Sequence, residues 1–430
     1  MNRPAPQRNP LWGWLGAETV SLVGTRLSMI AVPWLVLTTT GSPVLTGVVA
    51  FAEMTPYVVL KALTGPVVDR LGARRVSVTA DVLSLVVVGA VPLLHTLDLL
   101  TFPVLLVLVT LTGAVRGPGD GAKHALVPAV VDAAGVTLER ATGLQGASER
   151  LASTVGAAVA GALVAAVGPA TALALDAASF GVSALLLALT APGSGHPDGP
   201  GSGSYLSRLR EGWDFLRGEP VLLAMTGMVA ASNLLDAAFT TVLVPVWAQR
   251  TGGGAGALGL YFGSWSAAAV AGSLFASAYG ERLPRFRVYV VAFLLAGPPR
   301  FLLLALDVEA GLELGLVVGL TAVAGFACGF INPVLGAVLY ERIPAGLTGR
   351  VTALQGAICW SLLPLGGLLG GLLVSAAGLT TAMLVVGAAY LVVTLSPLAV
   401  PAWRALDDTR PGSGGGSPDG VPARALERVG

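Results

Sequence analysis

The sequence predicts an all-α membrane protein whose twelve transmembrane helices form two six-helix halves. Hydrophobic residues make up 54% of the 430 residues and charged residues only 11%, whereas soluble domains carry about 25% charged residues. A bilayer core about 30 Å thick takes about 20 apolar residues per helix, and twelve stretches of that length occur. One Gly/Pro/Ser-rich segment separates them into six and six.

The predicted spans are each bounded by Gly, Pro or charge. The first half contains 11–38, 43–66, 75–97, 99–123, 141–167 and 170–190. The second half contains 220–247, 257–280, 287–306, 312–340, 348–376 and 379–400. The first stretch follows basic residues as a signal peptide would, but it is longer than a normal signal core and lacks a small-residue cleavage site, so we expect a retained helix.

The segments outside the spans define the domain organisation. Residues 191–219 begin with a Gly/Pro/Ser tract and continue as a short charged amphipathic piece, which is typical of a linker. We therefore expect an N-terminal bundle over 1–190, a cytoplasmic linker over 191–219 and a C-terminal bundle over 220–400. Residues 401–430 are rich in Gly, Pro and Ser and predict a disordered cytoplasmic tail.

Arginine placement predicts the orientation in the membrane. In a twelve-span arrangement one side holds Arg70, Arg74, Arg75, Arg140, Arg208, Arg210, Arg217, Arg282, Arg285, Arg287, Arg342, Arg350 and Arg404. The opposite loops offer essentially Arg250. Because positive residues stay in the cytoplasm, we expect a multi-pass protein of the cell membrane with both termini cytoplasmic.

Charge and residue counts exclude several classes of protein. The net charge of +1 lacks the basic footprint of a nucleic-acid binder. The lysines Lys61 and Lys123 do not follow glycine, so no phosphate-gripping loop for ATP exists. Neither G-x-S-x-G nor H-E-x-x-H occurs, so we expect no enzyme.

Cysteine and histidine usage predicts neither a metal site nor a cofactor. The two cysteines lie in apolar runs and allow no disulfide framework or four-thiolate zinc site. The three histidines, His95, His124 and His196, stand far apart in the sequence. Spacing alone leaves open that ligands from distant helices meet.

The two halves match each other at a shift of 210 residues. Residues 142–168 face 352–378 without a gap, and 11 of these 27 positions are identical. Glycines 156, 161 and 168 fall on glycines 366, 371 and 378. Chance similarity of Gly/Ala/Leu-rich helices is the alternative, but the matched Thr, Gln and Gly positions favour a duplicated six-helix unit.

A charged motif follows the second predicted helix and carries a family resemblance. The run from Gly65 to Arg75 matches G-x-x-x-D-R-x-G-x-R-R and predicts a tight cytoplasmic turn. This motif resembles the loop motif of the major facilitator superfamily. The resemblance implies a conformational latch, in which the Asp pairs with a neighbouring helix, made of Gly65, Asp69, Arg70, Gly72, Arg74 and Arg75. The simpler interpretation is a positively charged loop whose Asp69 neutralises an arginine.

The resemblance extends over nearly the whole chain. The runs 30–37, 75–81 and 349–351 are similar to the subgroup of enterobactin exporters, macrolide-efflux proteins and Tap-like multidrug pumps. It implies a proton-driven exporter of small amphipathic compounds such as drugs, antibiotics or siderophores. The chain departs from the family in its helix-five motif G-P-x-x-G-G, which lacks the proline and one glycine at 156–161, and at Thr25, where relatives tend to carry Asp.

Ionisable residues inside the spans are the candidates for proton coupling. Such residues cost about 2.5–3.5 kcal/mol each and usually face a cavity or a partner. At 1.5 Å per residue, Glu18 and Arg116 each lie about 10 Å from the cytoplasmic ends of their helices, so depth permits a pair. Arg26 and Glu53 lie near the middle of adjacent helices and are a second possible pair.

The roles follow from these depths and from the resemblance. Arg116 begins a partial match to the helix-four motif R-x-x-Q-G-x-x-A, with Asp120 where the family often has Gln, and the resemblance links this Arg to proton coupling. We expect Glu18 to titrate, Arg116 to regulate it and Asp236 to be a second proton or cationic-substrate site, with structural ion pairs as the alternative. Asp176 and Arg300 are expected to snorkel to the membrane surface.

Polar and aromatic residues in the spans are candidates for an apolar substrate cavity, although each alone also suits ordinary packing. They are Tyr57, Asn233, Tyr261, Trp265, Asn332, Gln355 and Trp360. The expected partners are a small-molecule substrate, protons and the lipid bilayer, with no nucleic acid, and the expected state is a monomer. Nutrient uptake, uncoupled facilitation and a membrane sensor or scaffold are the alternatives to export.

Overall fold

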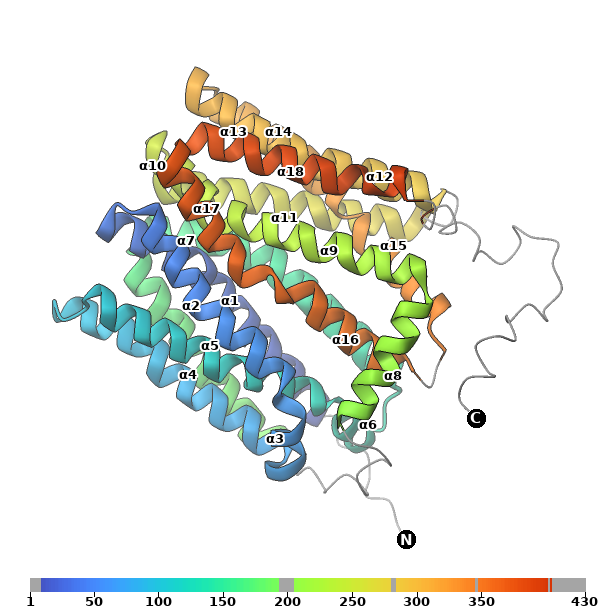
Figure 1. Ribbon diagram of the computed structural model, residues 1–430. Helices are drawn as coiled ribbons and strands as arrows, with labels where there is room; N and C mark the ends of the chain where they lie inside the picture. The colour runs from blue at the N-terminus through green and yellow to red at the C-terminus, as the bar shows by residue number, and fades with distance from the viewer. Residues whose placement is uncertain (1–8, 193–204, 280–283, 345–346, 401–402, 404–430) are drawn as a thin grey trace, which may run out of the picture.

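The structure, a computed structural model, describes residues 9–192, 205–279, 284–344, 347–400 and 403. Every element within these ranges is helical (Figure 1). In chain order the helices begin with α1 (Asn9–Thr40), α2 (Pro43–Ala62), α3 (Thr64–Leu71), α4 (Ala73–Thr96), α5 (Phe102–Ala125), α6 (Val127–Ala134), α7 (Leu138–Thr190), α8 (Tyr205–Gly218) and α9 (Pro220–Ala238). The π-helix η1 (Phe239–Leu243) precedes α10 (Val244–Arg250), α11 (Gly254–Tyr279), α12 (Arg285–Ala296), α13 (Pro298–Ala310), α14 (Leu314–Cys328), α15 (Ile331–Arg342), α16 (Thr348–Ser361), α17 (Leu363–Ala377) and α18 (Leu379–Ala399).

Within the described ranges, eleven helical segments are long and apolar enough to cross a membrane. They overlap the predicted spans, and the count differs from twelve at α7, which contains both the predicted fifth and sixth spans. Only Val159–Thr190 of α7 is a candidate span. The chain is therefore a multi-pass membrane protein, and all secondary structure in its described part is helical.

The predicted linker contains the helix α8, which starts where the charged amphipathic piece was expected. Residues 193–204 of the linker lie outside the described residues, as does the predicted tail apart from Trp403. Trp403 is buried, and its ring stacks on Tyr289 with centroids 5.3 Å apart.

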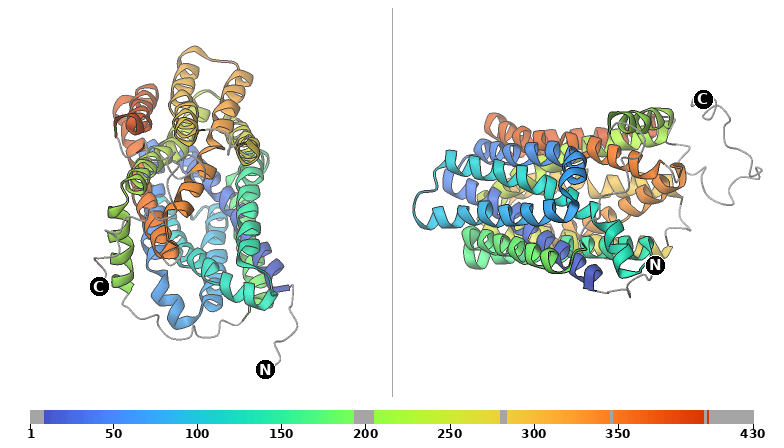
Figure 2. Two further views of the ribbon diagram at one scale, coloured as in Figure 1. Left: turned by 90° about the vertical axis from the view of Figure 1, so that its right-hand side faces the viewer. Right: turned by 90° about the horizontal axis from the view of Figure 1, so that it is seen from below.

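Helices of the two halves of the chain gather largely on separate sides of the molecule (Figures 1 and 2). On one side α1 packs along α7, while α5 lies between α2 and α4. On the other side α9 packs on α17, α11 on α14, and α13 on α18. The main contacts between the two sides join α2 to α17 and α7 to α11.

Two glycines matched by the 210-residue shift adopt the same unusual backbone conformation. Gly168, which breaks α7, has φ 81° and ψ 162°, and Gly378, between α17 and α18, has φ 84° and ψ 166°. A side chain at this positive φ would clash with the backbone. The sequence repeat thus coincides with a repeated turn.

Matched glycines also form close backbone contacts between the two sides. A Cβ atom on Gly161 of α7 would lie 1.9 Å from Cα of Gly259 on α11. A Cβ on Gly371 of α17 would lie 2.5 Å from the carbonyl oxygen of Pro43 at the start of α2. Small residues let helix backbones approach in a membrane, so these positions bring the two sides together at the end remote from Asn9.

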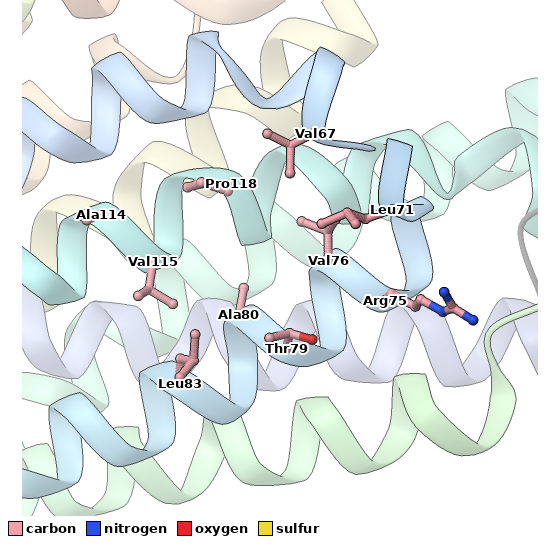
Figure 3. A pocket seen from close by; sticks show the side chains of 10 residues that line it. All are labelled: Val67, Leu71, Arg75, Val76, Thr79, Ala80, Leu83, Ala114, Val115 and Pro118. Carbon is pink, nitrogen blue, oxygen red and sulfur yellow. The ribbon is translucent and has the colours of Figure 1, made fainter. Parts of the chain in front are cut away.

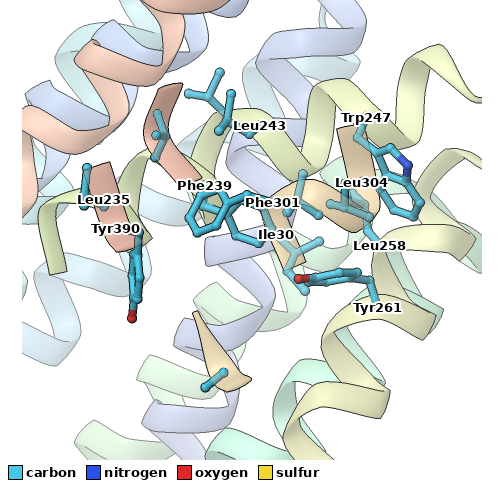
Figure 4. Close-up of a cluster of buried hydrophobic side chains, with 14 of the residues drawn as sticks. Ile30, Leu235, Phe239, Leu243, Trp247, Leu258, Tyr261, Phe301, Leu304 and Tyr390 are labelled. Carbon is cyan, nitrogen blue, oxygen red and sulfur yellow. The ribbon is translucent and has the colours of Figure 1, made fainter. Parts of the chain in front are cut away.

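The largest core cluster contains many aromatic side chains of the C-terminal helices (Figure 4). Phe239 of η1 packs on Phe301 of α13 with ring centroids 4.4 Å apart. Tyr261, a predicted cavity residue, is only 2% exposed here and contacts Phe239 and Trp247. Its surroundings are those of a core residue, because rings pack against it from several helices.

Candidate functional site

The interface between α2 and α5 is built on a stripe of glycines. A Cβ on Gly113 would lie 1.9 Å from the carbonyl oxygen of Glu53, and one on Gly117 would lie 2.5 Å from that of Tyr57. Glycines four residues apart fall on one face of a helix. The two backbones therefore touch along this face, which brings side chains of α2 and α5 into direct contact.

A buried ion pair crosses this interface. Nη1 of Arg116 lies 3.4 Å from Oε1 of Glu53, and the two side chains are 6% and 13% exposed. Nη2 of Arg116 donates a hydrogen bond of 2.9 Å to Oγ1 of Thr25 on α1. Breaking such a pair on one side leaves an uncompensated buried charge, which costs about 3–5 kcal/mol.

A second polar contact lies one helical turn further along. The hydroxyl of Tyr57, four residues after Glu53, donates to Oδ2 of Asp120 at 2.9 Å and accepts from Nζ of Lys61 at 3.2 Å. The Lys61 ammonium also lies 4.7 Å from the centroid of the Trp360 ring on α16. Tyr57 and Trp360 stack with centroids 6.1 Å apart.

The contact of Tyr57 and Lys61 with Trp360 joins α2 to α16, a helix of the other side of the molecule. Cation–π contacts of this kind contribute about 0.5–2 kcal/mol. Two predicted cavity residues, Tyr57 and Trp360, therefore do meet. Because Glu53 and Tyr57 share one face of α2, the ion pair and the contact between the two sides are connected through a single helical turn.

The observed ion pairing differs from both pairs that were expected from the positions of the residues along their helices. Glu18 does not take Arg116 as its partner; its Oε1 accepts a hydrogen bond of 2.8 Å from Gln145 of α7. Arg116 pairs with Glu53 instead, and Arg26 donates to the sulfur of Met29 at 3.3 Å. Depth places residues along a helix, whereas rotation about its axis decides which ones meet.

The C-terminal helices hold a second ion pair, between Asp236 of α9 and Arg300 of α13. Arg300 is 6% exposed, whereas the Asp236 side chain is 35% exposed. The guanidinium lies 4.7–5.2 Å from the ring centroids of Phe239, Trp265, Phe301 and Tyr390. One of these rings belongs to η1, and π-helical turns are frequent at functional sites.

The expectation that Asp176 and Arg300 snorkel is wrong. Asp176 is fully buried and accepts a hydrogen bond from Ser28 of α1. Arg300 points into aromatic rings and a carboxylate rather than to a membrane surface. Both groups are held inside because partners from other helices compensate for the loss of water.

The remaining predicted cavity residues have separate surroundings. Asn233 donates a hydrogen bond of 2.9 Å to the carbonyl oxygen of Cys359, which ties α9 to α16. Gln355 is half-buried on α16, and Asn332 is exposed on α15. Trp265 faces Arg300 at 5.0 Å.

The motif expected as a tight turn is mostly helical. Gly65 and Arg70 lie on α3, Arg74 and Arg75 lie in the first turn of α4, and the turn is made by Gly72 with φ 84°. Arg74 donates a hydrogen bond of 2.5 Å to the carbonyl oxygen of Ala188 on α7. Asp69 is on α3, but its side chain lies outside the described part of the structure.

A pocket of about 420 Å³ lies between α3, α4 and α5 (Figure 3). It is lined by apolar side chains such as Leu71 and Leu83, which are also exposed on the outer surface, and by Arg75. Neither Tyr57 nor Trp360 lines it, and its outward apolar lining suits lipid better than a polar solute.

Sequence reasoning missed a second buried ion pair in the N-terminal helices. Nζ of Lys123 on α5 lies 2.8 Å from Oδ1 of Asp81 on α4, and both side chains are less than 5% exposed. Lys123 also donates to Ser21 at 3.0 Å, and Asp81 accepts from Ser183 at 2.6 Å. The sequence could have indicated this pair, because an aspartate and a lysine lie inside consecutive apolar stretches.

Comparisons with known proteins agree with the resemblance seen in the sequence. The model of the Major Facilitator Superfamily matches residues 15–253 and 226–427. The multidrug efflux pump Tap of Mycobacterium bovis (strain BCG / Pasteur 1173P2) is 32% identical over 418 residues, which cover 93% of this chain and 95% of the pump. The Tap pump of Mycolicibacterium fortuitum is 31% identical over 409 residues, covering 93% of this chain and 98% of that pump. The fold is similar to the crystal structure of a mutant of the nucleoside transporter NupG, with a TM-score of 0.71 at 16% identity over 90% of this chain and 99% of that one.

Proposed function

The chain belongs to the major facilitator superfamily, in the group that contains the Tap pumps, and we propose that it is a proton-coupled antiporter that exports small amphipathic compounds. Similarity to pumps named for multidrug efflux favours export. The nucleoside transporter shares the fold at 16% identity, which supports no particular substrate or direction.

The transport cycle we propose is alternating access between two six-helix bundles, over 1–190 and 220–400, with twelve spans and both termini cytoplasmic. The repeated backbone conformation of Gly168 and Gly378 supports the bundles as related units. In this scheme Gly161 and Gly371 form contacts that close one end. Substrate binds between the bundles, where Tyr57 and Trp360 meet.

One observation carries the coupling proposal: the buried pair of Glu53 and Arg116. A proton on Glu53 removes its charge and therefore its attraction for Arg116, which keeps its hydrogen bond to Thr25 on α1. The two protonation states thus favour different contacts between α2, α5 and α1, which is the differential interaction a driven conformational change requires.

Glu53 suits this role better than Glu18, because it is the carboxylate that Arg116 contacts. Thr25 stands where relatives tend to carry Asp, and Glu53 supplies a carboxylate to the same guanidinium from the neighbouring helix. Asp236, partly exposed beside Arg300, is proposed as a second proton or cationic-substrate site.

Export is tested in drug-sensitive cells that express the chain, screened against a panel of antibiotics and chelators with and without a protonophore. We expect resistance to some of these compounds, and we expect the protonophore to abolish it. Uncoupled facilitation predicts efflux that the protonophore leaves unchanged.

The coupling residue is tested with the variant Glu53→Gln in inverted membrane vesicles. We expect substrate binding to persist while uptake driven by the pH gradient falls at least tenfold. The matched control is Asp132→Asn, which neutralises an exposed carboxylate on α6 and should transport like the wild type. Gradient-driven uptake by Glu53→Gln at the wild-type rate would remove Glu53 from the coupling mechanism.

The latch is tested with Asp69→Asn. We expect normal membrane insertion with slower transport, because the neutral side chain can no longer form a charged contact with a neighbouring helix. Undiminished transport by this variant would leave the motif as an ordinary cytoplasmic loop.

A further inference from the structure

Three ionisable side chains from distant parts of the sequence meet beside α1. They are Glu18 of α1, His124 of α5 and Glu149 of α7, and one ligand atom from each lies within 4.8 Å of the other two. Glu18 is buried, whereas His124 and Glu149 are exposed. The group therefore combines one buried carboxylate with two side chains that are exposed at the protein surface.

The buried carboxylate is held in place but incompletely satisfied. Glu18 is 4% exposed, and Gln145 fixes its Oε1 through a hydrogen bond of 2.8 Å. Within the described part of the structure its other oxygen, Oε2, is buried without a hydrogen-bond partner. Buried polar atoms are nearly always paired, so this carboxylate oxygen offers a lone pair to a ligand.

The histidine is oriented as a ligand. Nδ1 of His124 lies 2.9 Å from the carbonyl oxygen of Asp120. A carbonyl oxygen only accepts, so Nδ1 carries the hydrogen, which leaves Nε2 as the ring nitrogen that can bind a metal. Histidines that bind metals usually donate their other ring nitrogen to a carbonyl or carboxylate in this way.

A buried cation on the same helix as His124 is already engaged elsewhere. Lys123, adjacent to His124 in sequence, is paired with Asp81 at 2.8 Å and hydrogen-bonded to Ser21 at 3.0 Å. Among the described residues, neither Glu18 nor Glu149 forms an ion pair with a basic side chain. The two carboxylates thus place negative charge beside the imidazole, where a cation can neutralise it.

We propose that Glu18, His124 and Glu149 bind a divalent transition-metal ion of the Zn²⁺ class. In tetrahedral coordination, ligand atoms at about 2.0–2.2 Å from one ion lie about 3.3–3.6 Å from one another. The three ligand atoms here lie within 4.8 Å of one another, so the exposed side chains of His124 and Glu149 reach that spacing by moving inward by at most about 1.5 Å. Three protein ligands leave coordination positions open to water or to a chelating group.

The imidazole sets the selectivity. Nitrogen ligands favour Zn²⁺ and its neighbours, whereas Mg²⁺ prefers an all-oxygen shell and keeps its water. The site is separate from the pair of Glu53 and Arg116, so it does not rest on the proposed proton coupling. Spacing in the sequence predicted no metal site because the three ligands come from three helices.

The test is a titration of the full chain with Zn²⁺. The protein, purified without a histidine tag and treated with a chelator, is placed in lipid nanodiscs and studied by calorimetry. We expect about one Zn²⁺ per chain, with little response to Mg²⁺. Glu18→Gln, His124→Gln and Glu149→Gln should each weaken Zn²⁺ binding by at least about tenfold. With Co²⁺ as the probe, the visible absorption of the wild type should change in His124→Gln.

The matched controls remove equivalent groups elsewhere. His95→Gln on α4 and Asp132→Asn on α6 alter exposed side chains, and both should bind Zn²⁺ like the wild type. The proposal is overturned if the folded wild type binds no Zn²⁺, if the three ligand variants keep its affinity, or if His95→Gln weakens binding as much as His124→Gln. Should Glu18→Gln fail to fold, the exposed His124 and Glu149 variants decide the question.

Discussion

Replacing Glu53 by Gln removes the carboxylate that compensates for the buried charge of Arg116. The two groups are 3.4 Å apart, with side chains 13% and 6% exposed. At an effective dielectric constant of about 20, unit charges at this distance attract each other by about 5 kcal/mol. Loss of one partner should therefore destabilise the fold by about 3–5 kcal/mol.

A double-mutant cycle separates the pair from its surroundings. Glu53→Gln, Arg116→Gln and the double variant are compared by equilibrium unfolding in mixed micelles. Removing both charges leaves no uncompensated ion, so the double variant should be more stable than the sum of the single effects predicts. We expect a coupling energy of about 1–3 kcal/mol, lower than the Coulomb value because the amide oxygen introduced by Glu53→Gln can still accept a hydrogen bond from Arg116.

The control cycle uses the pair of Arg285 and Glu341 at the protein surface. These side chains are 15% and 31% exposed and form two contacts of 2.5 and 2.6 Å. A pair at the surface contributes about 0–1 kcal/mol despite its shorter distances. A coupling energy for Glu53 and Arg116 no larger than that of the control would refute the reasoning that burial gives this pair its strength.

Three further predictions concern contacts between helices. Gly161→Val places a side chain where even Cβ would lie 1.9 Å from Gly259, so transport should fall at least tenfold, while Gly143→Val, with open space at its Cβ, should transport normally in the same vesicles. Asp81→Asn removes the charged partner of the buried Lys123 and should lower the free energy of unfolding by about 3–5 kcal/mol. A decrease of less than about 1 kcal/mol would contradict this prediction. Trp360→Ala removes the ring that stacks on Tyr57 and should weaken substrate binding severalfold in an equilibrium binding assay, whereas Trp360→Phe should retain most of it.

Much of the fold could be predicted because it depends on properties that sequence states directly. A stretch of about 20 apolar residues must cross the bilayer as a helix, whatever its partners are. The repeat could also be predicted from the sequence, because the same positive φ requires a glycine at both Gly168 and Gly378. The expected turn around Asp69 was less accurate, since α3 extends as far as Leu71 before Gly72 makes the turn.

The contacts of the candidate site were harder to predict for a geometrical reason. Arg116 could be singled out because a charge inside a span needs a partner, but choosing Glu53 over Glu18 requires the rotation of three helices about their axes. Local packing supplies that rotation: Gly113 and Gly117 turn one face of α5 onto α2. Tyr261 was predicted to line a cavity but is buried in the core. Sequence alone could not separate the two, because an aromatic residue in a span suits a core as well as a cavity.

The contacts between the two sides of the molecule differ in kind along its length. Near the end remote from Asn9, backbones touch through Gly161 and Gly371, and no side chain separates them. Further along α2 the contact is made by the side chains of Tyr57, Lys61 and Trp360. Side chains can exchange one partner for another within a fixed backbone, whereas a glycine contact is either closed or lost. We infer that protonation acts where the contacts are adaptable, one turn from Glu53, and that the glycine contacts open as a unit in response.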